Sequence, residues 1–211
     1  MVSAEAAARL FAGTDGAYRF ARWGRPVVPV LFGAEDDRVA VFRAALQAIS
    51  ALTRHGMADP DPEMAANLMV FGVRDGADVG DVPAIGGLVP GIGCTLARLE
   101  AAGANQYRLF RFEAGGAIRA VFLFLRMDAA LVAPPVADLA LEQAARLVLL
   151  SGDAAFAGSL PLGWLDGVAG LRPGVAALIR AGYDPVLPDV ARDASHAVRL
   201  AARMPVDVVF P

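Results

Sequence analysis

The chain of 211 residues has few of the side chains that most often build metal and redox sites. It contains one cysteine, Cys94, and two histidines, His55 and His196. A single cysteine excludes an intramolecular disulfide, a redox-active cysteine pair and a cysteine-rich metal cluster. Because unpaired cysteines behave as small hydrophobic residues and are commonly buried, we expect Cys94 to lie in the core.

Long apolar runs and basic clusters are also missing. The longest uncharged stretch, Val82 to Ala97, is interrupted by prolines and glycines, whereas a membrane-spanning helix needs about 20 mostly apolar residues. The formal net charge is −3 and the arginines are scattered, which argues against nucleic-acid binding. Glu5 and Arg9 lie inside the N-terminal apolar segment, which therefore predicts an amphipathic helix and not a signal peptide.

Apolar side chains, in contrast, are abundant. The chain is 56% hydrophobic and 19% charged, and its mean hydropathy is +0.50. This composition is typical of a folded protein with a well-filled interior. No repeat, low-complexity tract or linker divides the sequence, so we expect one domain over residues 1–211.

The first half of the chain predicts a strand, a helix and a second strand. Pro26 to Phe32 is an apolar run in which Pro29 favours an edge position or a bulge. Asp36 or Asp37 can cap the helix that follows, and its apolar face is formed by Val39, Phe42, Leu46, Ile49 and Thr53.

The helix can end at His55-Gly56, with Gly56 in the left-handed conformation and His55 near the negative end of the helix dipole. Asn67 to Val73 predicts the second strand, and residues 74–88 are rich in Gly, Asp and Pro and predict a long loop. Gly91-Ile92-Gly93 lacks the third glycine of a dinucleotide-binding motif, so we expect only a glycine-rich entry to a helix over Cys94 to Ala101.

The clearest predicted unit is a β-hairpin. Tyr107 to Glu113 and Ala117 to Met127 flank the turn sequence Ala114-Gly115-Gly116. Val121 to Leu125 is apolar on both faces, which predicts a central strand covered by helices on at least one side.

The segment Ala137 to Ala154 predicts a helix that ends near Ser151-Gly152. Its layout is similar to the active-site helix of a zinc peptidase, which carries His at two positions four residues apart and Glu directly after the first. Here Leu141 and Ala145 occupy the histidine positions and Glu142 the glutamate position. The pattern therefore favours a helix of that shape without the metal, and we expect no metal ion or other cofactor.

The last part of the chain predicts a loop and two helices. Residues 156–170 contain several glycines around Trp164 and predict a loop. Pro173 suits the first turn of a helix, which Tyr183-Asp184-Pro185 ends, and Val190 to Met204 predicts the last helix. With the hairpin, these elements predict an α+β fold: a mixed sheet with a β-hairpin packed against several helices.

Five segments together carry a resemblance to a known family. They are Trp23 before PVVPVLF, Ala66-Asn67, Gln106-Tyr107-Arg108, LALEQAARLVLLSGDA, and Gly182-Tyr183-Asp184-Pro185. In order and spacing these segments resemble an uncharacterised bacterial family of zincin-like, mostly exported and often lipid-anchored proteins, whose helix reads Cys-x-His-Glu-Glu-x-x-Gln-x-Leu-Gly-Leu-x-Asn-Asp-Ser. The resemblance implies a single zincin-like domain and a periplasmic or other extracytoplasmic location, although the chain shows no signal peptide and a cytoplasmic location stays open.

Several reactive or metal-binding residues of that family pattern are replaced in this chain. Glu142 and Asp153 match its first Glu and its Asp, whereas Leu141 replaces the His and Arg146 the Gln. Both cysteines of the pattern are replaced, by Arg108 and Leu139. Their joint loss is what one expects if the two cysteines form a disulfide in the relatives.

The resemblance and the helix pattern suggest a candidate groove formed by Glu142, Arg146, Asp153, Tyr183 and Asp184. Glu142 has two interpretations: a remnant general base in a groove, or a structural residue that pairs with Arg146 one helical turn later. We expect the structural pair, and with it a non-catalytic, degenerate zincin-like module that binds an unknown protein or a component of the bacterial cell envelope. The alternative is a metal-independent hydrolase that uses Glu142.

Overall fold

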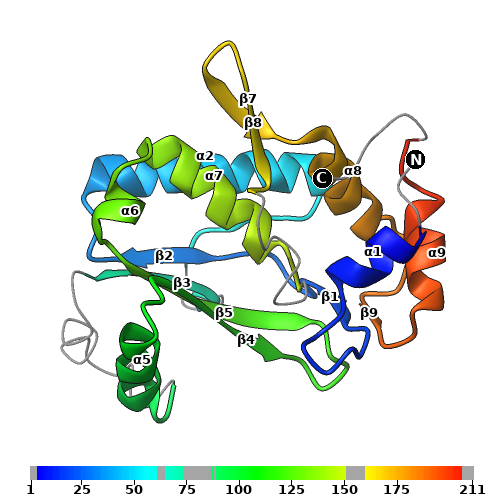
Figure 1. The fold of residues 1–211 in the computed structure, drawn as a ribbon, viewed down its shortest axis with the longest axis horizontal. Helices are drawn as coiled ribbons and strands as arrows, with labels where there is room; N and C mark the ends of the chain where they lie inside the picture. The colour runs from blue at the N-terminus through cyan, green and yellow to red at the C-terminus, as the bar shows by residue number, and fades with distance from the viewer. Residues whose placement is uncertain (1–3, 61–64, 74–86, 88, 151–159, 206–211) are drawn as a thin grey trace.

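A computed structural model describes residues 4–60, 65–73, 87, 89–150 and 160–205 and has an α+β fold. Its main sheet has the strand order β2-β3-β5-β4. Helices α2 and α7 cover one face of this sheet and helix α5 the other, as Figure 1 shows. The strands are β2 (Pro29–Phe32), β3 (Leu68–Val73), β4 (Gln106–Phe112) and β5 (Ile118–Arg126); the covering helices are α2 (Asp36–Thr53), α5 (Ile92–Ala101) and α7 (Val136–Leu147).

The sheet confirms the predicted hairpin, edge strand and central strand. β2, β3 and β5 run parallel, and β4 pairs antiparallel with β5 across the turn at residues 113–117. β2 begins at Pro29 and lies at one edge, where a residue without an N–H group is tolerated. β5 lies between β3 and β4, so Val121 to Leu125 form a central strand with a helix layer on each face.

Two hydrophobic cores fill the layers on either side of the sheet. Because side chains alternate along a strand, Leu68, Val70 and Leu123 join the core under α2 and α7, whereas Phe71, Phe122 and Phe124 join the core over α5. The rings of Phe71 and Phe124 stack in the second core with centroids 5.0 Å apart.

The ends of α2 differ from the prediction, although its buried face of Phe42, Leu46, Ile49 and Thr53 was predicted correctly. Its N-cap residue is Glu35, without a side-chain cap, and not Asp36 or Asp37. Its C-cap is Arg54, which takes the left-handed conformation at φ 57°, so Gly56 does not end the helix. The His55 ring instead donates from Nε2 to the carbonyl oxygen of Arg25 at 2.7 Å.

Helix α7 is shorter than predicted. It ends at Leu147, and Leu149–Leu150 form strand β6, which pairs with strand β1 (Phe20–Arg22) in a second sheet of order β6-β1-β9. Leu149 pairs with Arg22 and Leu150 with Ala21, and this long-range pairing overrides the helical spacing of the sequence. Ser151-Gly152, the predicted end of the helix, lies outside the described residues.

The last predicted helix, Val190 to Met204, is also divided. Val190–Ala191 form strand β9, which pairs with β1, and helix α9 covers only Ser195–Ala201. Helix α8 (Pro173–Gly182) has its proline in the first turn as predicted. The described residues include two further helices: α1 (Ala4–Leu10), which packs beside α9, and the short α6 (Ala129–Val132) before α7.

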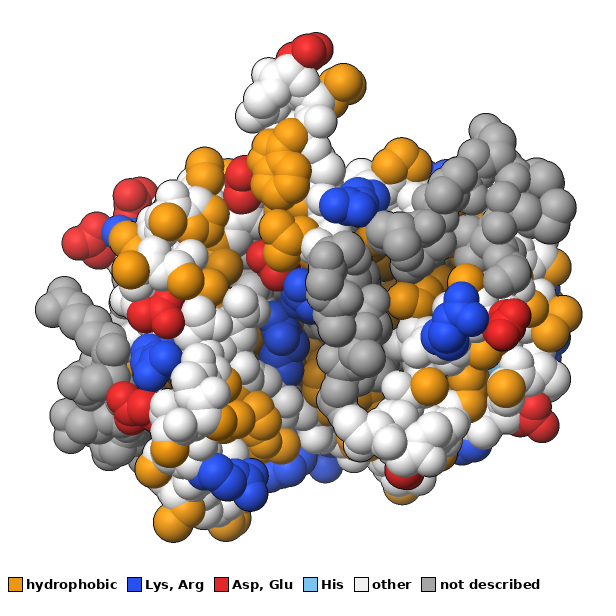
Figure 2. Space-filling model, in the orientation of Figure 1, with side chains coloured by type: hydrophobic (Ala, Val, Ile, Leu, Met, Phe, Trp, Pro, Cys, Tyr) orange, Lys and Arg blue, Asp and Glu red, His pale blue; other side chains and the backbone are white. Residues whose placement is uncertain are grey.

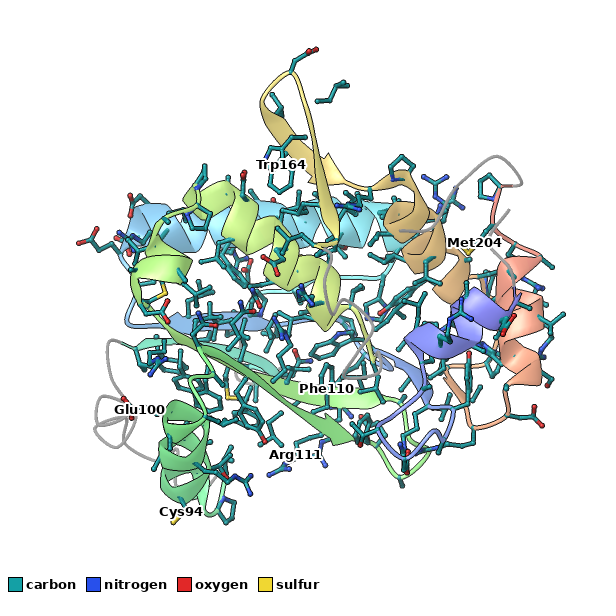
Figure 3. The ribbon with its side chains drawn as sticks, in the orientation of Figure 1. Cys94, Glu100, Phe110, Arg111, Trp164 and Met204 are labelled. Atoms are coloured by element: carbon teal, nitrogen blue, oxygen red, sulfur yellow. The ribbon has the colours of Figure 1, made fainter. Side chains whose placement is uncertain are left out.

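The predicted loop at 156–170 contains a β-hairpin where it is described. Strands β7 (Leu162–Leu165) and β8 (Val168–Leu171) pair across a tight turn at Asp166 and Gly167, which both have positive φ values. Paired positive φ values are typical of two-residue hairpin turns. The hairpin projects from the body of the molecule, and Trp164 on β7 donates a hydrogen bond to Asp138 on α7, 3.2 Å away (Figures 1 and 3).

Cys94 is exposed, so the prediction that it is buried is wrong. It lies in the first turn of α5, whose amphipathic surface buries Ile92 but turns Cys94 to solvent, as Figure 3 shows. In the part of the chain that the structure describes, no helix combines the length and the apolar character needed to cross a bilayer.

Candidate binding site between helix α7 and strand β4

Helix α7 lies across the main sheet and presents its buried residues, among them Leu139, Ala140, Ala144 and Leu147, to the core. Leu141 packs against this core and Ala145 is buried within it. These are the two positions where a zinc peptidase would carry its histidines. Among the described residues, no three His, Cys, Asp or Glu side chains come together in a way that could hold a metal ion.

Glu142 and Arg146 form the ion pair predicted from their spacing on the helix. Arg146 Nε donates to Glu142 Oε1 at 2.8 Å. The Glu142 side chain is only 12% exposed and the Arg146 side chain only 18%. The pair is therefore shielded from water more than an ordinary pair on a helix surface, and its two charges interact more strongly.

Arg108 on β4 reaches the same region from the sheet. Its Nη2 donates to Gln143 Oε1 of α7 at 2.5 Å and to Gln106 Oε1 of the same strand at 2.8 Å. Gln143, which is fully buried, donates from Nε2 to Gln106 Oε1 at 3.1 Å. Two neutral amide side chains therefore hold one guanidinium between the helix and the strand.

The charge of Arg108 is only partly compensated. Burial, and then the positive charge of Arg146, lower the pKa of the Arg108 guanidinium to about 10, while Glu142 acts in the opposite direction. Its Nε is buried and has no hydrogen-bond partner. We call Gln106, Arg108, Glu142, Gln143 and Arg146 the α7–β4 cluster, and its two arginines and one carboxylate give it a net charge of about +1 at neutral pH.

The surface view is consistent with this charge. Figure 2 shows positively charged side chains on the face of the molecule below the second half of α7. β4 is the outer strand of the main sheet at this side, and the aromatic side chains Phe110 and Phe112 follow Arg108 on its helix-facing side, with ring centroids 6.4 Å apart. Figure 3 shows Phe110 and Arg111 on opposite faces of the strand.

Of the other residues of the predicted groove, Tyr183 and Asp184 have their described contacts outside this cluster, and Asp153 lies outside the described residues. The Tyr183 hydroxyl donates to the carbonyl oxygen of Val148 at 2.8 Å and accepts from the Trp23 amide at 3.3 Å, and burial raises its pKa. Asp184 caps its own turn through the Val186 amide and pairs with Arg203 Nε at 3.0 Å.

The turn at Tyr183 and Asp184 is held by a buried arginine, and this explains its position. Arg22 donates to the carbonyl oxygens of Gly182, Asp184 and Leu187 and pairs with Asp189 at 2.6 Å. These contacts fix the segment after α8 against β1. The contacts described for Tyr183 and Asp184 thus serve the packing of this turn, and a groove shared with Glu142 stays a prediction.

Sequence reasoning missed Arg108, Gln106 and Gln143 as members of a site. A signal was present in the strand pattern: Arg108 and Phe110 are two residues apart and so share a face, and Phe110 marks that face as the one toward the core. A charged side chain on the inner face of a strand needs a partner. The sequence alone does not identify Gln143 as that partner.

No family model matches the chain, and neither does any curated protein or solved structure.

Proposed function

We propose that this protein is a non-catalytic binding module whose α7–β4 cluster takes a carboxylate group of its ligand. The single observation that carries the proposal is the state of Arg108: a half-buried guanidinium with neutral amide partners and a buried Nε without a hydrogen-bond partner. A partly desolvated cation is costly unless an anion pairs with it. A ligand carboxylate would supply that anion, and the planar guanidinium suits its two oxygens.

The state of Glu142 favours binding over hydrolysis. A general base needs a carboxylate that is free to take a proton from water or substrate. Glu142 instead accepts from Arg146 at 2.8 Å and lies in the field of Arg108. A zincin-like ancestry and a location in the bacterial cell envelope, both implied by the resemblance of the sequence, belong to this proposal.

A direct test compares ligands that differ only in charge. Short peptides with a free C-terminal carboxylate are titrated against the same peptides with an amidated C-terminus, followed by calorimetry. We expect only the free carboxylate to bind, and Arg108→Gln to weaken it by about 10- to 100-fold, the range for losing a charged hydrogen bond. Arg119→Gln is the matched control, because Arg119 is an exposed arginine on β5. Equal binding of both peptide forms would reject the carboxylate site.

The non-catalytic part of the proposal has its own test. Elemental analysis after dialysis against a weak chelator should find no stoichiometric transition metal, because Leu141 and Ala145 occupy the histidine positions of the helix. A screen of peptide and ester substrates should find no turnover. Zinc at one equivalent per chain, or turnover by the wild type that disappears in Glu142→Gln, would favour the hydrolase instead.

A further inference from the structure

A second, apolar site lies at the opposite end of α7 from Arg146. An open groove with a cavity volume of about 120 Å³ lies where β2, β3 and β5 end, and helices α2, α6 and α7 form its other walls. The carboxyl ends of parallel strands are a common place for ligands. Its side walls include Leu31, Phe42, Leu125, Leu131 and Leu139.

One missing side chain creates this space. Along β3, Leu68 and Val70 fill the layer between the sheet and the helices α2 and α7, and Gly72 is the next residue on that face. A Cβ atom at Gly72 would have its nearest neighbours 3.8 to 4.0 Å away, which is ordinary van der Waals contact. The layer thus has room for a larger residue at Gly72, and the glycine leaves that room open.

The lining of the groove is complementary to an amphiphilic ligand with one negatively charged end. Apolar side chains continue from its walls to its rim, where Phe32, Val132 and Val136 are 37%, 60% and 40% exposed. Figure 2 shows such hydrophobic side chains gathered around α6 and the start of α7. Among the described residues of the lining, Arg38 is the one with a charged side chain, and none of the described ion pairs includes it.

We propose that this groove binds a fatty acid, with the acyl chain over Gly72 and the carboxylate at Arg38. Burial of the chain against aliphatic walls supplies the affinity, since each methylene removed from water contributes about 0.8 kcal/mol. Arg38 supplies the preference for an acid over a neutral lipid of the same length. This site uses no residue of the α7–β4 cluster, so either proposal can fail without the other.

The test titrates saturated fatty acids of increasing length into the whole protein below their critical micelle concentrations. We expect saturable binding that tightens roughly three- to fourfold with each added methylene until the groove is full. Arg38→Gln should weaken dodecanoate roughly two- to fivefold, the value of an exposed ion pair, and leave dodecanol unchanged. Absence of saturable binding at every chain length, or an unchanged dodecanoate affinity in Arg38→Gln, would overturn the proposal.

Two variants test the position of the acyl chain. Gly72→Val fills the groove and should weaken dodecanoate at least tenfold without loss of thermal stability, whereas Gly170→Val on β8, where an added Cβ meets nothing within 4 Å, should bind like the wild type. Val132→Asp places a negative charge on the exposed rim and should also weaken dodecanoate, and this result stands even if Gly72→Val does not fold. Wild-type affinity in either variant, or an equal loss in Gly170→Val, contradicts the proposed position.

Discussion

Arg108 Nη2 on β4 lies 2.5 Å from Oε1 of the fully buried Gln143 on α7. The contact joins the edge strand of the main sheet to the helix that crosses it. A stabilising role for Arg108 predicts a large loss of stability on its removal, whereas a ligand-binding role predicts a small one. The two roles can therefore be separated by measurement.

We expect Arg108→Met to change the free energy of unfolding by less than about 2 kcal/mol. Removal of the desolvated charge relieves the cost of its burial, which offsets the cost of about 1–3 kcal/mol for the unpaired Gln143 oxygen. Gln143→Leu leaves the charge of Arg108 in place with one amide partner fewer, and should cost about 3 kcal/mol or more. Urea denaturation of the two variants checks this order, and the reverse order would assign Arg108 a structural role.

Glu142→Gln should lower the stability of the protein but strengthen its binding of a carboxylate. The variant leaves Arg146 without its carboxylate and should lower the free energy of unfolding by about 1–3 kcal/mol, above the value of an exposed helix pair, because both side chains are largely buried. It also raises the net charge of the α7–β4 cluster from about +1 to about +2 at neutral pH.

A peptide carboxylate should therefore bind Glu142→Gln more tightly, and more so at low salt. Calorimetry at two ionic strengths measures this, with Glu100→Gln on α5 as a control that removes an exposed carboxylate elsewhere. Weaker carboxylate binding in Glu142→Gln than in that control would mean that Glu142 itself contacts the ligand.

Leu147→Ala tests the packing of α7. Leu147 is 1% exposed in the core between α7 and the sheet, and its truncation should cost about 2–5 kcal/mol. Val132→Ala at an exposed position should cost less than about 0.5 kcal/mol. If the two losses of unfolding free energy are similar, helix α7 is not packed on the sheet as described.

The elements that the sequence predicted correctly are those whose periodicity is local. The apolar face of α2 repeats every third or fourth residue, and Val121 to Leu125 is apolar on both faces, so each pattern has one structural solution. The described β6 and β9 are two residues long and exist because both pair with β1. No local pattern distinguishes Leu149–Leu150 from a last helical turn, and so α7 was predicted too long.

In the candidate site, too, the local contact was predicted and the long-range contact was not. Glu142 and Arg146 are one helical turn apart, and their pair was predicted from that spacing. Arg108 and Gln143 are 35 residues apart and meet only because β4 is the edge strand beneath α7. Tyr183 and Asp184 were placed in the site by resemblance, but the described contacts of Arg22 hold their turn against β1 instead.

A buried histidine gives the last prediction, which concerns acid stability. His196 on α9 is 0% exposed, and its Nδ1 lies 2.7 Å from the Tyr18 hydroxyl, while its Nε2 has no hydrogen-bond partner. Burial, and then the positive charges of Arg199, Arg22 and Arg203, lower its pKa from 6.5 to about 4. The folded protein therefore keeps His196 neutral at a pH where the unfolded chain already binds a proton.

Because the folded pKa lies below the unfolded one, the stability contributed by neutral His196 is complete above pH 6.5 and is lost as the pH falls toward 4. The difference corresponds to about 3 kcal/mol of unfolding free energy. Aspartates with lowered pKa values act at a lower pH, since Asp15 titrates between 3.8 and about 2. Urea titrations between pH 7 and pH 4.5 should therefore show most of this loss in the wild type and a much smaller loss in His196→Leu. Tyr18→Phe keeps the buried imidazole and should retain the pH dependence, so a flat profile in that variant would show that His196 is not the titrating group.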